Sequence, residues 1–197
     1  MLWLQKTVAR EVSVEGVGLH SGQPARMTFA PAAPNTGLVF VVPGPEGEVR
    51  IPARVEHAVP AEDLVRATTL AKDGATVHTV EHVLAGLAGL GVTNCEIRLE
   101  GGEPPVTACG SAISYVEMVD EAGVQEQALP SLYYKINRPM SLRDGDVELH
   151  AEPCDHFRLS FHIDYDDPGK RAQGVKFEIG PASCRGRVAP AGAAAPL

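Results

Sequence analysis

Residues 78–82 read His-Thr-Val-Glu-His and bring two imidazoles and a carboxylate together within five positions. On a helix, residues four apart share a face, so His78 and His82 could approach one cation while Glu81 stands beside them as a general base. Taken literally, the pattern is the H-x-x-E-H signature of inverted zinc peptidases. A catalytic zinc takes three protein ligands, and this segment offers at most two. The other ligands would have to come from elsewhere.

The same segment also begins the strongest helical pattern of the chain. Thr79 is predicted to be the N-cap, and Gly91 is predicted to end the helix. Apolar residues follow at spacings of three and four: Val80, Val83, Leu84, Leu87 and Leu90. As N-cap, Thr79 would leave His78 outside the helix and off the face of His82. A histidine and a glutamate in the first turn of a core helix, with Glu81 favoured by the helix dipole, is therefore the simpler alternative.

Composition limits the classes of partner. The chain has 197 residues, 44% of them hydrophobic, which is enough for a packed globular core. Its formal charge of -8 comes from 25 acidic and 17 basic residues without a basic run. This composition argues against a nucleic-acid partner or an anionic membrane surface and favours a small-molecule or peptide substrate.

The cysteines and the hydropathy pattern indicate the compartment. No CxxC pair occurs, so neither a disulfide framework nor a thiolate zinc site is predicted, and free thiols in a reducing compartment are expected. No run of about 18 apolar residues suggests a transmembrane segment. We therefore expect a cytoplasmic protein. The four cysteines are Cys95, Cys109, Cys154 and Cys184.

Short strands and two helices are predicted along the chain, which makes the fold class α+β. A second helix, Ala112–Ala122, is expected to end at Gly123. After residues 125–131, the stretch Lys135–Pro153 is similar to Lys6–Pro31, which suggests two copies of one β-rich unit, the second without its helices. Predicted strands are Thr7–Val14, Ala25–Phe29, Leu38–Val42, 51–57, 66–71, Cys95–Gly101, Tyr133–Ser141, Val147–Pro153 and Phe157–Ile163, with a turn at 72–74.

Several separated motifs then occur in one order. They are GVGLHSG (16–22), PAAPNTG (31–37), TVEHVLAGLAGLG (79–91), NCEIRL (94–99), GSA (110–112), DEAG (120–123) and FEIGPA (177–182). With these motifs the chain resembles the zinc-dependent UDP-3-O-acyl-N-acetylglucosamine deacetylases of lipid A biosynthesis, from about Gln5 to about Ala182.

The resemblance implies a fold and its limits. The family fold is a two-layer β-α-α-β domain that is repeated twice, and the second copy is expected to be incomplete here. Residues 1–126 would form the first domain, which carries the TVEH motif, and residues 131–182 would supply strands of the second. Residues 183–197 are rich in alanine and proline and are expected to form a disordered tail.

The resemblance also assigns roles. Glu81 would be the catalytic base, His82 a ligand of Zn²⁺, and His20 a substrate-binding residue. The position before TVE is not a ligand in the family, so His78 would be incidental. The substrate would be a nucleotide-sugar glycolipid precursor, whose N-acetyl group is hydrolysed to release acetate. The oligomeric state stays open.

The family's other two zinc ligands, a histidine and an aspartate in an HKxxD pattern, do not occur in this sequence. His156 and His162 are explained by an exposed strand face, so we do not assign them as zinc ligands in place of the missing two. We expect a chain that is truncated, or frameshifted near residue 183, with weak zinc binding and negligible turnover. An inverted zinc peptidase and a non-catalytic remnant or binding module are the alternatives.

Overall fold

The computed structural model describes residues 3–59, 67–106, 110–165, 169 and 171–179. They group into two compact units, the first reaching Ser131 and the second beginning at Leu132. The predicted tail, residues 183–197, lies outside the described residues. Neither α-helix among the described residues is long and apolar enough to cross a membrane.

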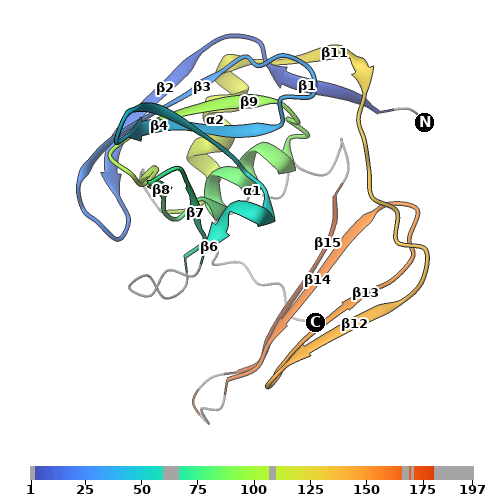
Figure 1. Ribbon diagram of the computed structural model, residues 1–197. Coiled ribbons are helices and arrows are strands. Elements are labelled where there is room, and N and C mark those ends of the chain that lie inside the picture. Colours follow the sequence, from blue (N-terminus) through green and yellow to red (C-terminus); the bar gives the residue numbers. More distant parts are fainter. Residues whose placement is uncertain (1–2, 60–66, 107–109, 166–168, 170, 180–197) are drawn as a thin grey trace. The chain divides into compact units, whose positions relative to one another are not determined.

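A six-stranded sheet and two helices make up most of the first unit, so the predicted α+β class is confirmed. The sheet order is β10-β2-β3-β9-β4-β5, and β4 and β9 are its parallel pair. Both helices lie against one face of this sheet (Figure 1). The elements are β1 (Leu4–Val8), β2 (Val12–Gly18), β3 (Pro24–Ala30), β4 (Leu38–Gly44), β5 (Gly47–Pro52), a 3-10 helix (Val55–His57), β6 (Ala58–Val59), β7 (Thr69–Lys72), β8 (Ala75–Val77), α1 (Glu81–Gly89), β9 (Cys95–Glu100), β10 (Pro105–Val106), α2 (Ile113–Ala122) and β11 (Val124–Pro130).

Alternation along the central strands separates core from solvent. Ile97 and Leu99 of β9 are buried on the face that carries the helices, with Met27 and Phe29 of β3 beside them. Residues between them point the other way, as the two-residue period of a strand requires. Burial of each such side chain contributes about 1.5–3 kcal/mol, so this layer holds the sheet and the helices together.

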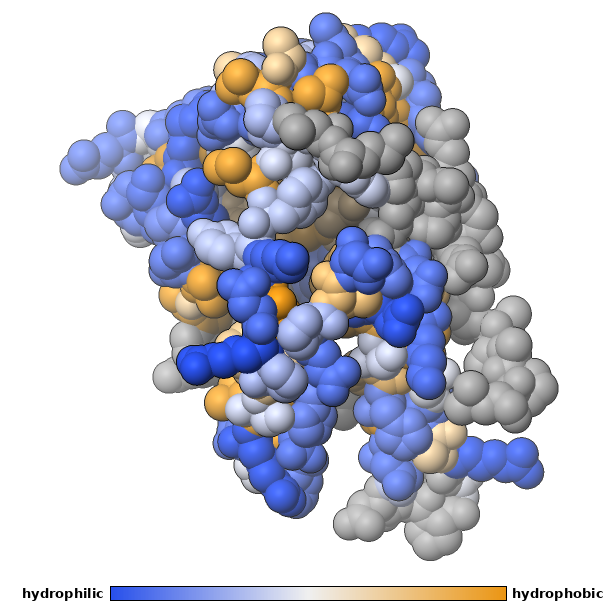
Figure 2. Space-filling view, turned by 90° about the vertical axis from the view of Figure 1, so that its right-hand side faces the viewer, coloured by the Kyte–Doolittle hydropathy of each residue, from blue (hydrophilic) through white to orange (hydrophobic). Residues whose placement is uncertain are grey.

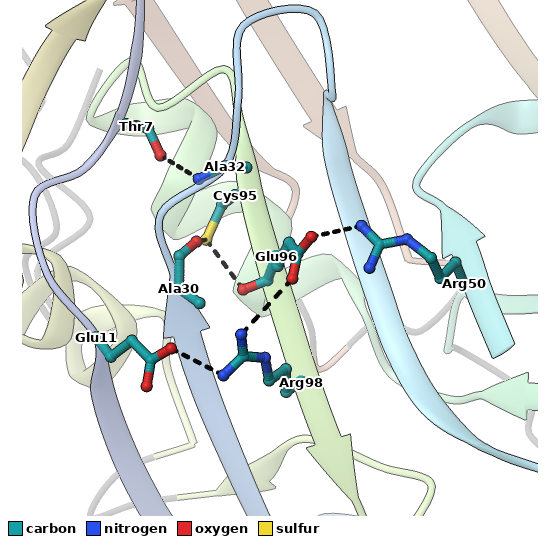
Figure 3. A network of polar contacts seen from close by, with 8 residues as sticks. All are labelled: Thr7, Glu11, Ala30, Ala32, Arg50, Cys95, Glu96 and Arg98. Carbon is teal, nitrogen blue, oxygen red and sulfur yellow. Dashed lines mark hydrogen bonds and ion pairs between the residues drawn. The ribbon is translucent and has the colours of Figure 1, made fainter. Parts of the chain in front are cut away.

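The outer face of the sheet carries charged side chains. Arg98 of β9 lies 2.8 Å from a carboxylate oxygen of Glu11 and 3.8 Å from one of Glu96. Glu96 also pairs with Arg50 of β5 at 2.6 Å (Figure 3). These pairs are half exposed, and each contributes little to stability. They keep this face of the sheet solvated while the opposite face is covered.

The two helices approach closely at a glycine. A Cβ added at Gly86 of α1 would lie 3.2 Å from the Cβ of Tyr115 in α2, whereas one added at Gly89 would meet nothing within 4 Å. The apolar and small residues of α1 therefore face the core on one side only. Of these two glycines, Gly86 is needed for the close approach of the helices and Gly89 is not.

The predicted end of α1 is confirmed and its predicted start is wrong. Gly91 has a φ of 74°, and the amides of Gly91 and Val92 donate to the carbonyls of Ala88 and Leu87, which is a Schellman motif. At the other end Val80 is the N-cap, and no side chain caps the helix. Thr79 lies outside it with a φ of 56°.

Several strand predictions need correction. Thr7–Val14 is not one strand, because the chain leaves β1 after Val8 and enters β2 at Val12. Residues 125–130, for which no strand was predicted, belong to β11, which pairs antiparallel with β1. The alternation rule missed β11 because most of its side chains are exposed on both faces. The predicted α2 is confirmed to within one residue.

A buried network of side-chain amides joins β1, β11 and the loop at 31–37. The Asn94 amide nitrogen donates to Gln5 Oε1 at 2.8 Å and to Gln127 Oε1 at 2.7 Å, while Asn94 Oδ1 accepts the amide of Gly37 at 2.8 Å. Gln5 also accepts the backbone amide of Asn35 at 2.8 Å. Such a network is stabilising only while every member is satisfied. The asparagines of the motifs PAAPNTG and NCEIRL are thus structural.

The second unit contains two hairpins, β12 (Met140–Asp144) with β13 (Val147–Ala151) and β14 (Phe157–Ile163) with β15 (Gln173–Ile179). Its first predicted strand, Tyr133–Ser141, is wrong for residues 133–139. Many apolar side chains of the hairpins are exposed, among them Leu142 and Phe157, at 67% and 62%. Figure 2 shows hydrophobic side chains at the surface among hydrophilic ones.

A matched pair of substitutions tests the helix contact. Gly86→Ala should destabilise the protein by about 1 kcal/mol, because the added methyl group overpacks the contact with Tyr115. Gly89→Ala should leave stability unchanged or raise it by up to about 1 kcal/mol, since alanine is the better helix former and meets no neighbour. Denaturant unfolding measures both. Equal effects of the two substitutions would contradict this packing.

Removal of the central amide tests the polar network. Asn94→Ala should cost about 3 kcal/mol, because it leaves the oxygens of buried Gln5 and half-buried Gln127 and the Gly37 amide with fewer partners. Ser13→Ala removes an exposed 2.7 Å hydrogen bond to Thr28 and is the control, with an expected change of at most about 0.5 kcal/mol. The midpoints of urea unfolding distinguish the two. Similar small losses would show that the network contributes little.

Candidate active site

Glu81 and His82 are the first two residues of α1. Both side chains are half-buried, and the backbone amide of Thr68 donates to Glu81 Oε2 at 3.1 Å. A carboxylate in the first turn is also stabilised by the positive end of the helix dipole. The start of the helix therefore fixes a carboxylate and an imidazole side by side at the edge of the core.

A small pocket, with a volume of about 10 Å³, lies beside His82. The residues that line it come from the turn before β3, the start of α1, the segment around β10 and α2. Among these described residues there is no lysine or arginine, so no positive side chain of the lining would repel a cation. The lining residues are Leu19, Thr79, His82, Pro104, Val106, Gly110, Ser111 and Tyr115.

His78 does not join this pocket. It precedes α1, its backbone amide donates to the carbonyl of Gly102 at 3.0 Å, and its Nδ1 lies 3.0 Å from Thr69 Oγ1. Because the helix begins only at Glu81, His78 and His82 are not four residues apart on one helix. The two histidines that the H-x-x-E-H interpretation requires on a common metal therefore do not share a helix face.

A buried carboxylate that the sequence analysis missed binds Thr79 and precedes Pro104, two residues that line the pocket. Glu103 is 2% exposed. Its oxygens accept the backbone amides of His20 at 3.0 and 3.1 Å and of Ser21 at 2.9 Å, and the hydroxyls of Ser21 at 2.8 Å and Thr79 at 2.7 Å. A lone charged residue in the uncharged loop GGEPPV was the only sequence signal for it.

The hydrogen bonds decide the ionisation of Glu103. Burial alone raises the pKa of this carboxyl group, but the donors from Ser21, Thr79 and His20 outweigh it and hold the pKa below its ordinary value. Glu103 is therefore a carboxylate at neutral pH. Its charge is stabilised by donors from two separate segments.

Thr79 is held in an unusual backbone conformation. Its φ of 56° lies in the left-handed region, which a β-branched residue rarely adopts and which costs about 1–3 kcal/mol. The side chain is 5% exposed and donates to Glu103 Oε1. Thr79 directly precedes the N-cap of α1, so the backbone conformation just before this helix is strained.

His20 lies in the turn between β2 and β3. Its backbone is fixed by Glu103, its side chain is exposed, and the preceding residue, Leu19, lines the pocket. Of the three residues selected from the sequence, His82 lines the pocket, while Glu81 precedes it in the chain and His20 follows the lining residue Leu19. They come from segments that are about sixty positions apart in the sequence.

Tyr115 closes the pocket from α2. Burial raises the pKa of its hydroxyl to about 12, and the negative charges of Glu103 and Glu81 contribute in the same direction. The hydroxyl donates to the carbonyl of Pro105 at 3.1 Å. The surroundings of the pocket are therefore negative, which suits a bound cation.

The cysteines take no part in the described site. Cys95 is a free thiol in the core, and burial raises its pKa to about 12. Cys154 is free and exposed, next to Asp155 and His156, with which its donor atoms lie within 4.8 Å. Cys109 and Cys184 lie outside the described residues.

Comparison with known proteins shows the family. A family model described as "LpxC: UDP-3-O-acyl N-acetylglycosamine deacetylase" matches residues 5–193. Three proteins named UDP-3-O-acyl-N-acetylglucosamine deacetylase are similar: those of Anaeromyxobacter sp. Fw109-5 (42% identity, 84% of this chain, 53% of the relative), Anaeromyxobacter dehalogenans 2CP-C (42%, 90%, 56%) and Myxococcus xanthus DK1622 (40%, 89%, 55%).

The match covers most of this chain but only part of its relatives. The chain spans about half the length of the curated relatives it matches. The family model covers residues 5–193, which include both helices and the described hairpins. The chain belongs to the UDP-3-O-acyl-N-acetylglucosamine deacetylase family.

Proposed function

We propose that this chain carries part of the active site of a zinc-dependent deacetylase, which hydrolyses the N-acetyl group of UDP-3-O-acyl-N-acetylglucosamine in lipid A biosynthesis. The observation that carries the proposal is the pairing of Glu81 with His82 at the start of α1, where His82 lines a pocket with negative surroundings. The names of the relatives support the substrate. The reaction would take place in the cytoplasm.

The residues present suit a divalent cation. The imidazole of His82 is a common zinc ligand, and the carboxylates of Glu81 and Glu103 lower the energy of a cation nearby. When bound, zinc supplies a Lewis acid and lowers the pKa of a coordinated water. The described lining offers one ligand, His82, so two further ligands are required from outside it.

The remaining steps belong to side chains of this chain. Glu81 lies beside His82 and would accept the proton of the attacking water as a general base. The amide that Thr68 donates to Glu81 Oε2 would orient this carboxylate. His20, in the exposed turn beside Leu19, would contact the nucleotide-sugar glycolipid precursor. The released products would be acetate and the free amine of the glucosamine.

We also propose the domain limits from the family resemblance. Residues 1–126 would form the first domain and residues 131–182 the strands of a second one. The pairing of β11 with β1 supports moving the end of the first domain from residue 126 to residue 130.

An inverted zinc peptidase is the weaker alternative. It needs His78 as a second ligand, and His78 lies before α1 with its Nδ1 at Thr69. A non-catalytic binding module that kept the fold is the other alternative. Both are outcomes of the following test.

Zinc binding and acetate release test the proposal. The 197-residue chain should bind zinc weakly, and His82→Ala should abolish that binding, whereas His57→Ala, a histidine outside the pocket lining, should not change it. Zinc binding that survives His82→Ala would refute the ligand assignment. Equilibrium dialysis with metal analysis measures both variants.

The role of Glu81 needs a chain with all zinc ligands. Fusion to the C-terminal part of the Anaeromyxobacter dehalogenans relative should give acetate release from UDP-3-O-acyl-N-acetylglucosamine. Glu81→Gln should lower that rate by at least about 10²-fold, because the general base is lost. Cleavage of peptides would favour the peptidase, and zinc binding without any hydrolysis would favour the binding module.

A further inference from the structure

Three segments that line the pocket meet at one buried group. Leu19 belongs to the turn before β3, Thr79 precedes α1, and Pro104 follows Glu103 directly. We propose that Glu103 is a positioning residue, which fixes these segments relative to one another and thereby sets the approach of His82 and Glu81 to the metal. The inference rests on the proposed function.

The first contact of Glu103 is with the turn at 19–22. Both carboxylate oxygens lie at the backbone amides of His20 and Ser21, and Oε2 also accepts the Ser21 hydroxyl. The turn is closed by a hydrogen bond from the amide of Gly22 to the carbonyl of Gly18 at 3.0 Å. A Cβ at Gly18 would clash with the carboxylate of Glu103 and the hydroxyl of Ser21. The carboxylate therefore fills the space that this glycine leaves.

The second contact is with Thr79, and it determines how the chain enters α1. Thr79 adopts a left-handed conformation although glycine or asparagine would adopt it more readily. Its hydroxyl donates to Glu103 Oε1 at 2.7 Å, and the next amide, that of Val80, donates to the carbonyl of Thr68 at 3.2 Å. Glu81 follows Val80, so these two hydrogen bonds set the position of the first turn.

The charge of Glu103 makes the two contacts interdependent. Among the described residues no lysine or arginine pairs with it, so its ionised form depends on the donors of the turn and of Thr79. Loss of one donor leaves a buried carboxylate less well satisfied, and the structure must shift to compensate. The turn and the start of α1 are therefore coupled through one carboxylate. Removal of a group that orients a metal ligand typically lowers the metal affinity by about 10–100-fold. Glu103 would act on Glu81 and His82 indirectly, through Thr79 and Val80.

A purely structural role for Glu103 makes a different prediction. In that case variants at Glu103 or Thr79 would change zinc affinity only as far as they change stability. The test therefore uses substitutions in which the backbone conformation is retained and only the hydrogen bond is lost.

Thr79→Gly and Thr79→Asn form the matched pair. Both residues adopt a positive φ readily, but only asparagine brings a side-chain donor for Glu103. In the 197-residue chain, zinc titration followed by NMR of the His82 imidazole should show about tenfold weaker binding for Thr79→Gly, without a fall in melting temperature. Thr79→Asn should retain at least part of the wild-type affinity. Equal zinc affinity of Thr79→Gly and the wild type would overturn the inference.

Glu103→Gln and Asn94→Ala complete the experiment. Glu103→Gln presents an amide to the backbone donors and should also weaken zinc binding by about tenfold. Asn94→Ala destabilises the unit through a separate network and should leave zinc affinity unchanged. If the loss of affinity in Glu103→Gln only matches that in Asn94→Ala, the role is structural and the inference is wrong.

The controls separate the two proposals. If His82→Ala does not reduce zinc binding, the proposed function fails and the inference fails with it. If His82→Ala abolishes binding while Thr79→Gly and Glu103→Gln bind like the wild type, the proposed function stands and the inference alone is refuted.

Discussion

The carboxylate of Glu103 is buried without a cationic partner among the described residues, and the pocket depends on how its charge is satisfied. Burial of an ion costs several kcal/mol unless it is paired or fully hydrogen-bonded. Here the donors are two backbone amides of the turn at 19–22 and two hydroxyls, those of Ser21 and Thr79. Each donor belongs to a segment that lines the pocket. The hydrogen bonds that stabilise the charge of Glu103 therefore also hold these segments together.

The same charge shapes the electrostatics of the site. Glu103 and Glu81 both act on Tyr115, whose pKa rises to about 12, with burial as the larger cause. A hydroxyl in such surroundings stays protonated and donates, here to the carbonyl of Pro105. The negative charges that disfavour ionisation of the Tyr115 hydroxyl would favour a cation beside His82. Structural and electrostatic roles of the buried carboxylate are thus inseparable.

The sequence predicted what depends on local pattern. Helix α2, the glycine that ends α1 and the strand β14 all follow from neighbours within four residues. The roles of Glu81 and His82 come from the family resemblance and stay a prediction. Contacts between distant segments were not predictable in this way. The strand β11 forms because β1 offers it an edge, and Glu103 binds backbone amides more than 80 positions away, which no side-chain pattern records.

The predicted N-cap was wrong for a reason that bears on the site. A threonine before a helix usually accepts an amide of the first turn with its hydroxyl, while its own backbone stays extended. Thr79 instead donates that hydroxyl to Glu103 and takes a positive φ. Glycine would relieve the backbone but has no donor, whereas threonine is stiff about χ1 and holds its hydroxyl in one direction. Threonine at this position therefore suits the hydrogen bond to the buried carboxylate and not the cap of the helix, which starts without a side-chain cap two residues later, at Glu81. The N-cap prediction from local propensity is wrong here because the hydrogen bond from Thr79 to Glu103, 24 residues away, stabilises the structure more than a cap would.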